Sequence, residues 1–86
     1  MNNYIDNLIA ELKGKAPKQV TEQDYEYGLN CLPPIMQASA GFVQGEPYVH
    51  DNKGKALYYI FKEIKGKFYK KIGYPADFGK ESFWNI

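Results

Sequence analysis

The chain has 86 residues and a net charge of +1, with eleven lysines, no arginine and a single cysteine. A chain of this length forms one domain around one modest core, so residues 1–86 are expected to fold as a unit. The lone Cys31 excludes an internal disulfide. The lack of arginine argues against sequence-specific recognition of nucleic acid, because arginine is the main bidentate reader of guanine.

Two helices are predicted before residue 35. The first covers residues 3–13, and the apolar positions that share its buried face are Tyr4, Ile5, Leu8, Ile9 and Leu12. The second begins after Thr21, a favourable N-cap followed by several acids, which suit the positive end of a helix dipole. It ends at Pro33-Pro34, because proline restricts the residue before it and cannot donate a backbone hydrogen bond.

From residue 41 onward the sequence is typical of strands. Apolar and polar residues alternate, and β-branched and aromatic residues are frequent. Strands are predicted near 41–50, 56–64 and 67–73, with a turn at 51–54 and a tight hairpin at 65–66. We therefore expect an α+β fold, in which the two helices cover one face of a three-stranded antiparallel meander. Pro47 lacks a backbone donor, which fits an edge position for the first strand, and the third strand would be the other edge.

The C-terminal segment contains a short helical turn in this interpretation. Pro75 suits the first position of that turn. Phe83 and Trp84 are too apolar to remain free in water, and the sequence leaves two alternatives open for them. Either they fold back on the domain, or they form a docking point for a partner.

The candidate binding surface lies on the first strand. If residues 41–50 are extended, the side chains of Glu46, Tyr48 and His50 project from one face, because strand side chains alternate. Tyr58 or Tyr59 on the neighbouring strand would lie beside them. An edge strand also offers unpaired backbone groups for strand addition. The sequence therefore predicts a small, non-enzymatic module that binds a protein partner through this edge.

Nucleic acid is the first alternative partner, because the C-terminal half is basic and aromatic. Residues 1–52 hold three lysines and seven acids, whereas residues 53–86 hold eight lysines and three acids. A stacking and phosphate-binding surface would be formed by Lys62, Lys67, Tyr69, Lys70 and Lys71. Such a surface predicts weak binding with a strong dependence on salt.

Catalysis is the second alternative. Glu46 and His50 could form an acid–base pair, and Cys31 with His50 could form a nucleophile pair, provided that each pair lies within hydrogen-bond reach. One histidine, one cysteine and scattered acids do not supply a metal site, and no glycine-rich phosphate-binding loop is present. No catalytic residue, metal or cofactor is therefore predicted.

One set of motifs resembles a group of small, uncharacterised bacterial proteins. The residues that carry the resemblance are Leu32-Pro33-Pro34, Gly41-Phe42, Gly45-Glu46-Pro47-Tyr48, His50, Tyr58-Tyr59 and Lys67-Phe68-Tyr69. The likeness covers about residues 20–78 and brings no known activity with it. Proteins of this size are often carried by phages and plasmids, where many block a host protein, and this analogy of size suggests a modulator of that kind.

The cellular location is inferred from what the sequence lacks. The chain does not begin with a basic segment followed by an apolar run, so no signal peptide is expected. No apolar stretch approaches the ~20 residues that cross a bilayer. We therefore expect a cytoplasmic protein, either a monomer or a homodimer through the exposed edge.

Overall fold

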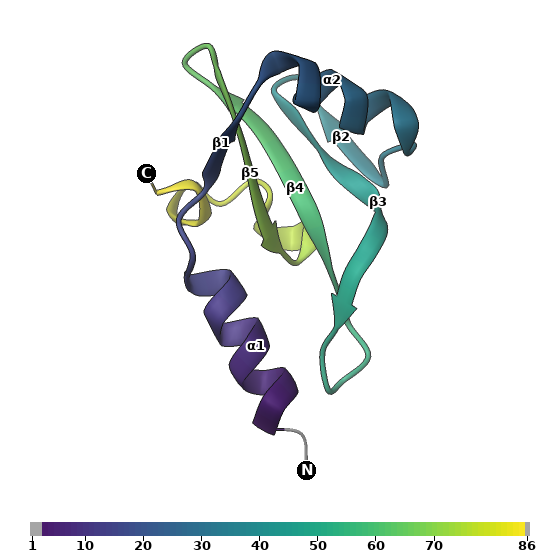
Figure 1. Ribbon diagram of the computed structural model, residues 1–86, viewed down its shortest axis with the longest axis vertical. Coiled ribbons are helices and arrows are strands. Elements are labelled where there is room, and N and C mark those ends of the chain that lie inside the picture. Colours follow the sequence, from purple (N-terminus) through teal and green to yellow (C-terminus); the bar gives the residue numbers. More distant parts are fainter. Residues whose placement is uncertain (1–2, 86) are drawn as a thin grey trace.

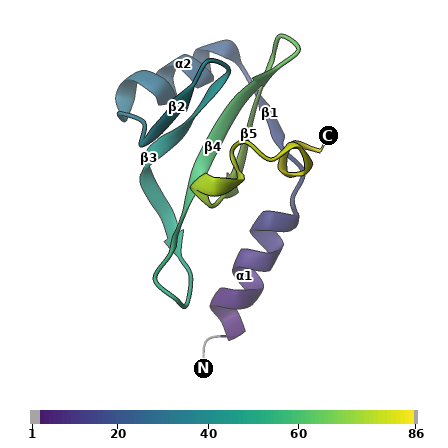
Figure 2. The ribbon, with the colours of Figure 1, turned by 180° about the vertical axis from the view of Figure 1, so that it is seen from behind.

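The computed structural model describes residues 3–85, in which five strands form one antiparallel sheet with helical segments on both of its faces (Figures 1 and 2). In chain order the elements are α1 (Asn3–Gly14), β1 (Lys18–Val20), α2 (Glu22–Cys31), β2 (Met36–Ala38), β3 (Gly41–His50), β4 (Ala56–Ile64), β5 (Lys67–Gly73) and the 3₁₀ turns η1 (Pro75–Asp77) and η2 (Glu81–Trp84). Within residues 3–85, no helix is long and apolar enough to cross a membrane.

Both helices form where their sequence signals predict them. In α1, Ile9 and Leu12 are buried while Tyr4 on the same helix is 75% exposed. In α2, the Thr21 hydroxyl accepts a hydrogen bond from the backbone N–H of Asp24 at 3.1 Å, as expected for an N-cap. The helix ends at Cys31, two residues before the first proline. The local signals therefore determine both helices.

The class α+β is confirmed, but the predicted three-stranded meander is wrong. The sheet has five strands in the order β1-β5-β4-β3-β2, and the three predicted strands form its centre. The two additional strands come from the connectors on either side of α2. Residues 18–20 pair with β5, and residues 36–38 fold back on the start of β3. Each has only three residues, too few for an alternating pattern to be recognised, so their pairing depends on distant partners.

The additional strands change which margins of the sheet are exposed. The third predicted strand, β5, is not an edge, because β1 pairs with it from Lys18 to Val20. The first, β3, is covered by β2 only over Gly41–Val43. Beyond Val43 no described strand pairs with its outer side, so Pro47 does lie in an edge segment.

The core is divided between the two faces of the sheet. On the first, here called the helix face, Phe42 and Phe61 stack with ring centroids 4.6 Å apart. Tyr25 of α2 packs against them edge-on, with its centroid 5.2 Å from that of Phe42. Gly28 allows α2 to approach closely, since a Cβ there would already lie 3.4 Å from the Phe42 ring.

The second face, here called the tail face, is covered by the C-terminal segment. Val43 comes directly after Phe42, and Ile60 comes directly before Phe61. Because side chains alternate along a strand, Val43 and Ile60 project to the other side of the sheet, where they pack with the tail. Figure 2 shows this segment crossing the sheet on the side opposite α2. The sequence predicts helices on one face only, and the structure adds the C-terminal segment as the cover of the other face.

The C-terminal segment folds back on the domain, which decides between the two alternatives for Phe83 and Trp84. The turn at Pro75 forms as predicted and is followed by a second 3₁₀ turn. Both Phe83 and Trp84 are buried, and the Trp84 indole N–H donates to the Phe78 carbonyl at 2.9 Å. The Lys71 ammonium donates to the Phe83 carbonyl, also at 2.9 Å. These aromatic side chains are core, so they are not available as a docking point.

Candidate functional site

The polar segment of β3 is bent by bulges. Its pairing with β4 shifts once between Val43 and Pro47 and again between Pro47 and Val49. A bulge adds residues to one strand and changes which face the next side chain occupies. The predicted row along a single face therefore does not form.

The consequence is that Tyr48 and His50 lie on opposite faces. The Tyr48 ring is 5.2 Å from that of Tyr59, on the helix face. His50 instead pairs with Ala56 of β4. Ala56 and Tyr58 are alternate residues of that strand, so both side chains project to the tail face, and the side chain of His50 lies on the same face. The structure thus brings Tyr48 and Tyr59 together and separates both from His50 and Tyr58.

The outer margin of β3 is also poorly suited to strand addition. Pro47 has no N–H to offer an added strand. A Cβ on Gly45 would overlap the Pro33 carbonyl oxygen, which shows that the connector before β2 lies directly against the backbone there. Bulges and proline are the devices by which natural sheets protect their edges from pairing.

The residues considered for catalysis are not assembled. Glu46, His50 and Cys31 are all exposed. Among residues 3–85 no hydrogen bond joins Glu46 to His50, or Cys31 to His50. In the same part of the chain no group of three histidine, cysteine or acidic side chains could hold a metal ion.

The residues considered for nucleic acid are divided between the two faces. Lys62 lies on the tail face, with its ammonium 6.0 Å from the Phe78 ring centroid, and Lys71 is bonded to the tail as described above. Tyr69 packs against the same apolar cluster. Lys70 projects to the helix face, where it lies 5.0 Å from the Tyr59 ring centroid. Lys67, at the hairpin, is exposed. These five residues therefore do not form one continuous surface.

On the helix face, α1 and α2 leave the middle of the sheet without a covering helix (Figure 1). Two hollows lie there, with volumes of about 180 and 360 Å³, and Tyr59 and Lys70 line both of them. We call the two hollows together the tyrosine–lysine groove. Its other lining residues are Leu12, Lys15, Ala16, Tyr48, Lys71 and Ile72 in the first hollow and Val20, Asp24, Tyr27, Gly28, Gln44 and Phe61 in the second.

This groove combines exposed aromatic surface with positive charge. Tyr48 in the first hollow is 50% exposed and Tyr27 in the second is 70% exposed. In the sheet Lys18 stands directly opposite Lys70, although like charges in that position repel each other. Burial, with a smaller contribution from Tyr48, raises the pKa of the Tyr59 hydroxyl, so that hydroxyl remains a neutral hydrogen-bond donor.

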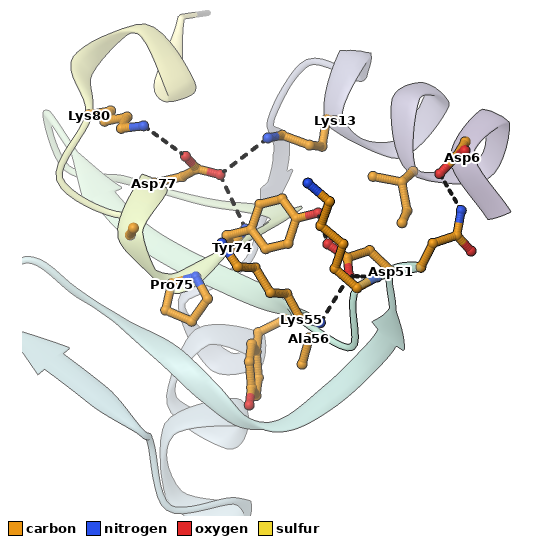
Figure 3. Close-up of a pocket in the computed structure, with 14 residues that line it drawn as sticks. Asp6, Lys13, Asp51, Lys55, Ala56, Tyr74, Pro75, Asp77 and Lys80 are labelled. Carbon is orange, nitrogen blue, oxygen red and sulfur yellow. Dashed lines mark hydrogen bonds and ion pairs between the residues drawn. The ribbon is translucent and has the colours of Figure 1, made fainter.

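A second and larger concavity, the polar cavity, has a volume of about 910 Å³. It lies where α1, the β3–β4 turn and η1 meet (Figure 3). The residues that line it are Asp6, Ile9, Lys13, Asp51, Asn52, Lys53, Lys55, Ala56, Tyr58, Tyr74, Pro75, Ala76, Asp77 and Lys80.

Asp51 and Tyr74 join two sides of the polar cavity. The Tyr74 hydroxyl donates to Asp51 Oδ2 at 2.7 Å, and Asp51 Oδ1 accepts the backbone N–H groups of Lys53 and Lys55 at 2.8 and 2.9 Å. The bond to the Tyr74 hydroxyl is the main cause that lowers the pKa of the Asp51 carboxyl. The same bond raises the pKa of Tyr74 to about 12, so its hydroxyl keeps its proton near neutral pH.

Asp77 connects α1 to the C-terminal segment. Its carboxylate accepts the backbone N–H of Tyr74 at 3.2 Å and lies 3.7 Å from the Lys13 ammonium and 3.4 Å from the Lys80 ammonium. Figure 3 shows Asp77 between these two lysines. The Lys13 ammonium also lies 4.7 Å from the centroid of the Tyr74 ring. Asp77 is buried, so this arrangement neutralises a charge that would otherwise be costly to desolvate.

Comparisons of the chain with protein-family models, with curated proteins and with solved structures give no match. The functional interpretation therefore depends on the two concave sites. Sequence reasoning included Tyr48, Tyr59 and Lys70 but missed Lys15, Lys18 and Tyr27, which reach the tyrosine–lysine groove only through the helices and β1. The polar cavity was missed as well, because its walls come from α1, the β3–β4 turn and η1, which are far apart in the sequence.

Proposed function

We propose that the protein is a small, non-enzymatic binding module that receives an acidic segment of a partner protein in the tyrosine–lysine groove. The observation that carries this proposal is the contact of Tyr48 with Tyr59, whose ring also lies under the Lys70 ammonium. The two rings meet at an interplanar angle of 71°, and the Lys70 ammonium lies beside Tyr59. Tyrosines that are fixed in place and half exposed are favourable anchors for a partner, since little side-chain entropy is lost on binding.

The charge around the groove favours an acidic partner. Lys15 and Lys70 line the groove, and Lys18 is adjacent to Lys70 in the sheet. Asp24 is the one acid among the lining residues of the two hollows. Bringing an acidic segment here would relieve the repulsion between Lys18 and Lys70 and would accelerate association.

The biological role that we propose is the modulation of a host protein, as small proteins of phages and plasmids do. In this role the chain acts in the cytoplasm and uses the groove to occupy a surface of its target. The residues first considered for the contact, Glu46, His50 and Tyr58, lie outside the groove and become secondary contacts at most. The supports are the size of the chain and the shape and charge of the groove.

The test is quantitative affinity capture from extracts of a bacterial host, with the whole chain as bait. The groove variant is Tyr48→Ala with Lys70→Gln. Its matched control is Tyr4→Ala with Lys67→Gln, which makes the same chemical changes at exposed positions outside the groove. We expect the groove variant to bind the captured partner at least tenfold more weakly and the control to bind within twofold, since anchor residues commonly contribute more than ~1.4 kcal/mol.

Two results would contradict the proposal. The first is a partner that both variants retain equally, because the groove would then not be the contact. The second is capture that disappears after nuclease treatment and falls steeply with salt, which would replace a protein partner with nucleic acid. Circular dichroism of each variant establishes that the fold is intact.

A further inference from the structure

The polar cavity lies apart from the tyrosine–lysine groove. Its aspartates and its lysines differ in how far they are engaged by other groups of the protein. Its three aspartates are occupied within the protein. Asp51 accepts three hydrogen bonds, Asp77 accepts one and is paired with two lysines, and Asp6 accepts a hydrogen bond from the side-chain amide of Asn52 at 2.6 Å. These carboxylates therefore have little capacity left for a cation.

The lysine side chains of the β3–β4 turn have fewer polar partners than the aspartates. Lys53 and Lys55 line the cavity, and within residues 3–85 neither ammonium group makes a hydrogen bond or a close ion pair. Their backbone N–H groups are both fixed on Asp51, so the turn that carries the two side chains has a defined shape. Gly54 between them has φ +83°, a conformation that favours glycine. The turn thus presents two ammonium groups at the cavity without a close ion pair to any described residue, and the Lys55 ammonium acts on the Asp51 carboxylate only through longer-range charge attraction.

The remaining walls are partly apolar. Tyr58 and Ile9 are only partly or barely exposed, and Pro75 and Ala76 complete this side. A volume of about 910 Å³ lies within the range of concave sites that receive small molecules. Such a site suits a ligand with a doubly charged end and a flat or apolar body.

We propose that the polar cavity binds a phosphorylated small molecule, with the phosphate held by Lys53 and Lys55 and the body lying against Tyr58 and Pro75. A phosphate monoester carries about two negative charges at neutral pH, which matches the two ammonium groups of Lys53 and Lys55 that make no close ion pair with the described residues. Lysine is a common phosphate ligand that acts as a point charge. The site needs no glycine-rich loop, because the charges come from side chains and not from backbone N–H groups.

The chain supplies a matched control for the test. Lys53-Gly54-Lys55 and Lys65-Gly66-Lys67 have the same sequence pattern and stand at opposite ends of β4, and both glycines have positive φ. Lys65 and Lys67 are exposed and do not line the polar cavity. Lys53→Gln/Lys55→Gln and Lys65→Gln/Lys67→Gln therefore remove the same charge from two turns with the same Lys-Gly-Lys pattern, of which only the first lines the cavity.

The experiment is a titration of the isotope-labelled full chain with adenosine monophosphate, adenosine and inorganic phosphate, followed by backbone amide shifts in NMR spectra. We expect adenosine monophosphate to shift the amides of residues 51–56 and 74–80. Adenosine should bind at least tenfold more weakly than its monophosphate. The Lys53→Gln/Lys55→Gln variant should lose at least tenfold in affinity for the monophosphate, whereas the Lys65→Gln/Lys67→Gln variant should remain within twofold of the wild type.

Three outcomes would overturn the proposal. One is the absence of shifts at residues 51–56 with both phosphate-bearing probes at about 10 mM, since a ligand that does not bind at this concentration has no specific site here. Another is equal binding of adenosine and its monophosphate, which would show that the phosphate does not contribute to the affinity. The last is an equal loss of affinity in the two double variants, which would show a general response to positive charge.

Discussion

Replacing Trp84 with alanine tests the finding that the C-terminal segment is part of the core. Trp84 is 5% exposed, packs with Val43 and Ile60, and donates its indole N–H to the Phe78 carbonyl. A buried aromatic side chain removes ~150–250 Å² from water, which at ~25 cal/mol per Å² corresponds to ~4–6 kcal/mol. Replacements of buried tryptophan by alanine in other proteins cost about 3–5 kcal/mol. We therefore expect the free energy of unfolding to fall by about 3–5 kcal/mol.

That loss is large for this chain. At ~0.05–0.15 kcal/mol per residue, a domain of 86 residues has a total stability of roughly 4–13 kcal/mol. Urea unfolding followed by far-ultraviolet circular dichroism measures the change, because Trp84 is the only tryptophan and its fluorescence is lost in the variant. The Trp84→Phe variant keeps a ring but leaves the Phe78 carbonyl without its donor, and it should lose about 1–3 kcal/mol.

The control for this measurement is Tyr4→Ala, which removes an aromatic side chain that is 75% exposed. Its stability should change by less than about 0.5 kcal/mol, as surface substitutions usually do. If Trp84→Ala were no more destabilising than this control, the C-terminal segment would not contribute to the core. The division of the core between two faces of the sheet would then be incorrect.

Two further predictions concern the β3 margin and the polar cavity. Gly45→Ala should lower the free energy of unfolding in urea by about 1–3 kcal/mol, because its Cβ would overlap the Pro33 carbonyl oxygen. The control is Gly14→Ala, which has nothing near its Cβ and should be neutral or stabilising by up to ~1 kcal/mol. Equal effects of the two substitutions would contradict the close contact between Gly45 and Pro33. Tyr74→Phe should be less stable than the wild type by a margin that is constant between about pH 5 and 9. Because the pKa of Tyr74 is raised from 10.0 to about 12, its contribution is complete below pH 10 and is lost as the pH rises through about 12. Because the pKa of Asp51 is lowered, the difference in stability between the wild type and Tyr74→Phe should also shrink as the pH falls below about 4. A difference in stability that stays the same at both low and high pH would refute the Asp51–Tyr74 hydrogen bond.

Much of the secondary structure could be predicted from local signals. The amphipathic spacing of α1, the cap at Thr21, the prolines after α2 and the glycine in the hairpin at residue 66 each act within a few residues of the element that they define. The same holds for the turn at Pro75. These elements appear in the structure close to their expected bounds.

The candidate sites were harder to predict because they depend on pairing between distant segments. Tyr48 and Tyr59 were both named from the sequence, yet His50 was grouped with Tyr48 on the assumption of regular alternation. The two register shifts in β3 break that alternation, and a bulge leaves no dependable mark in a single sequence. Lys18 reaches Lys70 only because residues 18–20 pair with β5, some fifty residues further along the chain.

The sequence by itself determined the helices, the three long strands and the α+β class, since these follow from short-range periodicity and from the backbone preferences of proline and glycine. Only the tertiary structure decided the five-stranded sheet, the burial of Phe83 and Trp84 and the positions of the two concave sites. The physical reason is that a strand of three residues has no stability of its own and forms where a partner strand and an apolar surface already exist. The faces on which Tyr48, His50 and the lysines lie are fixed by that long-range pairing, and so are the surfaces available to a partner.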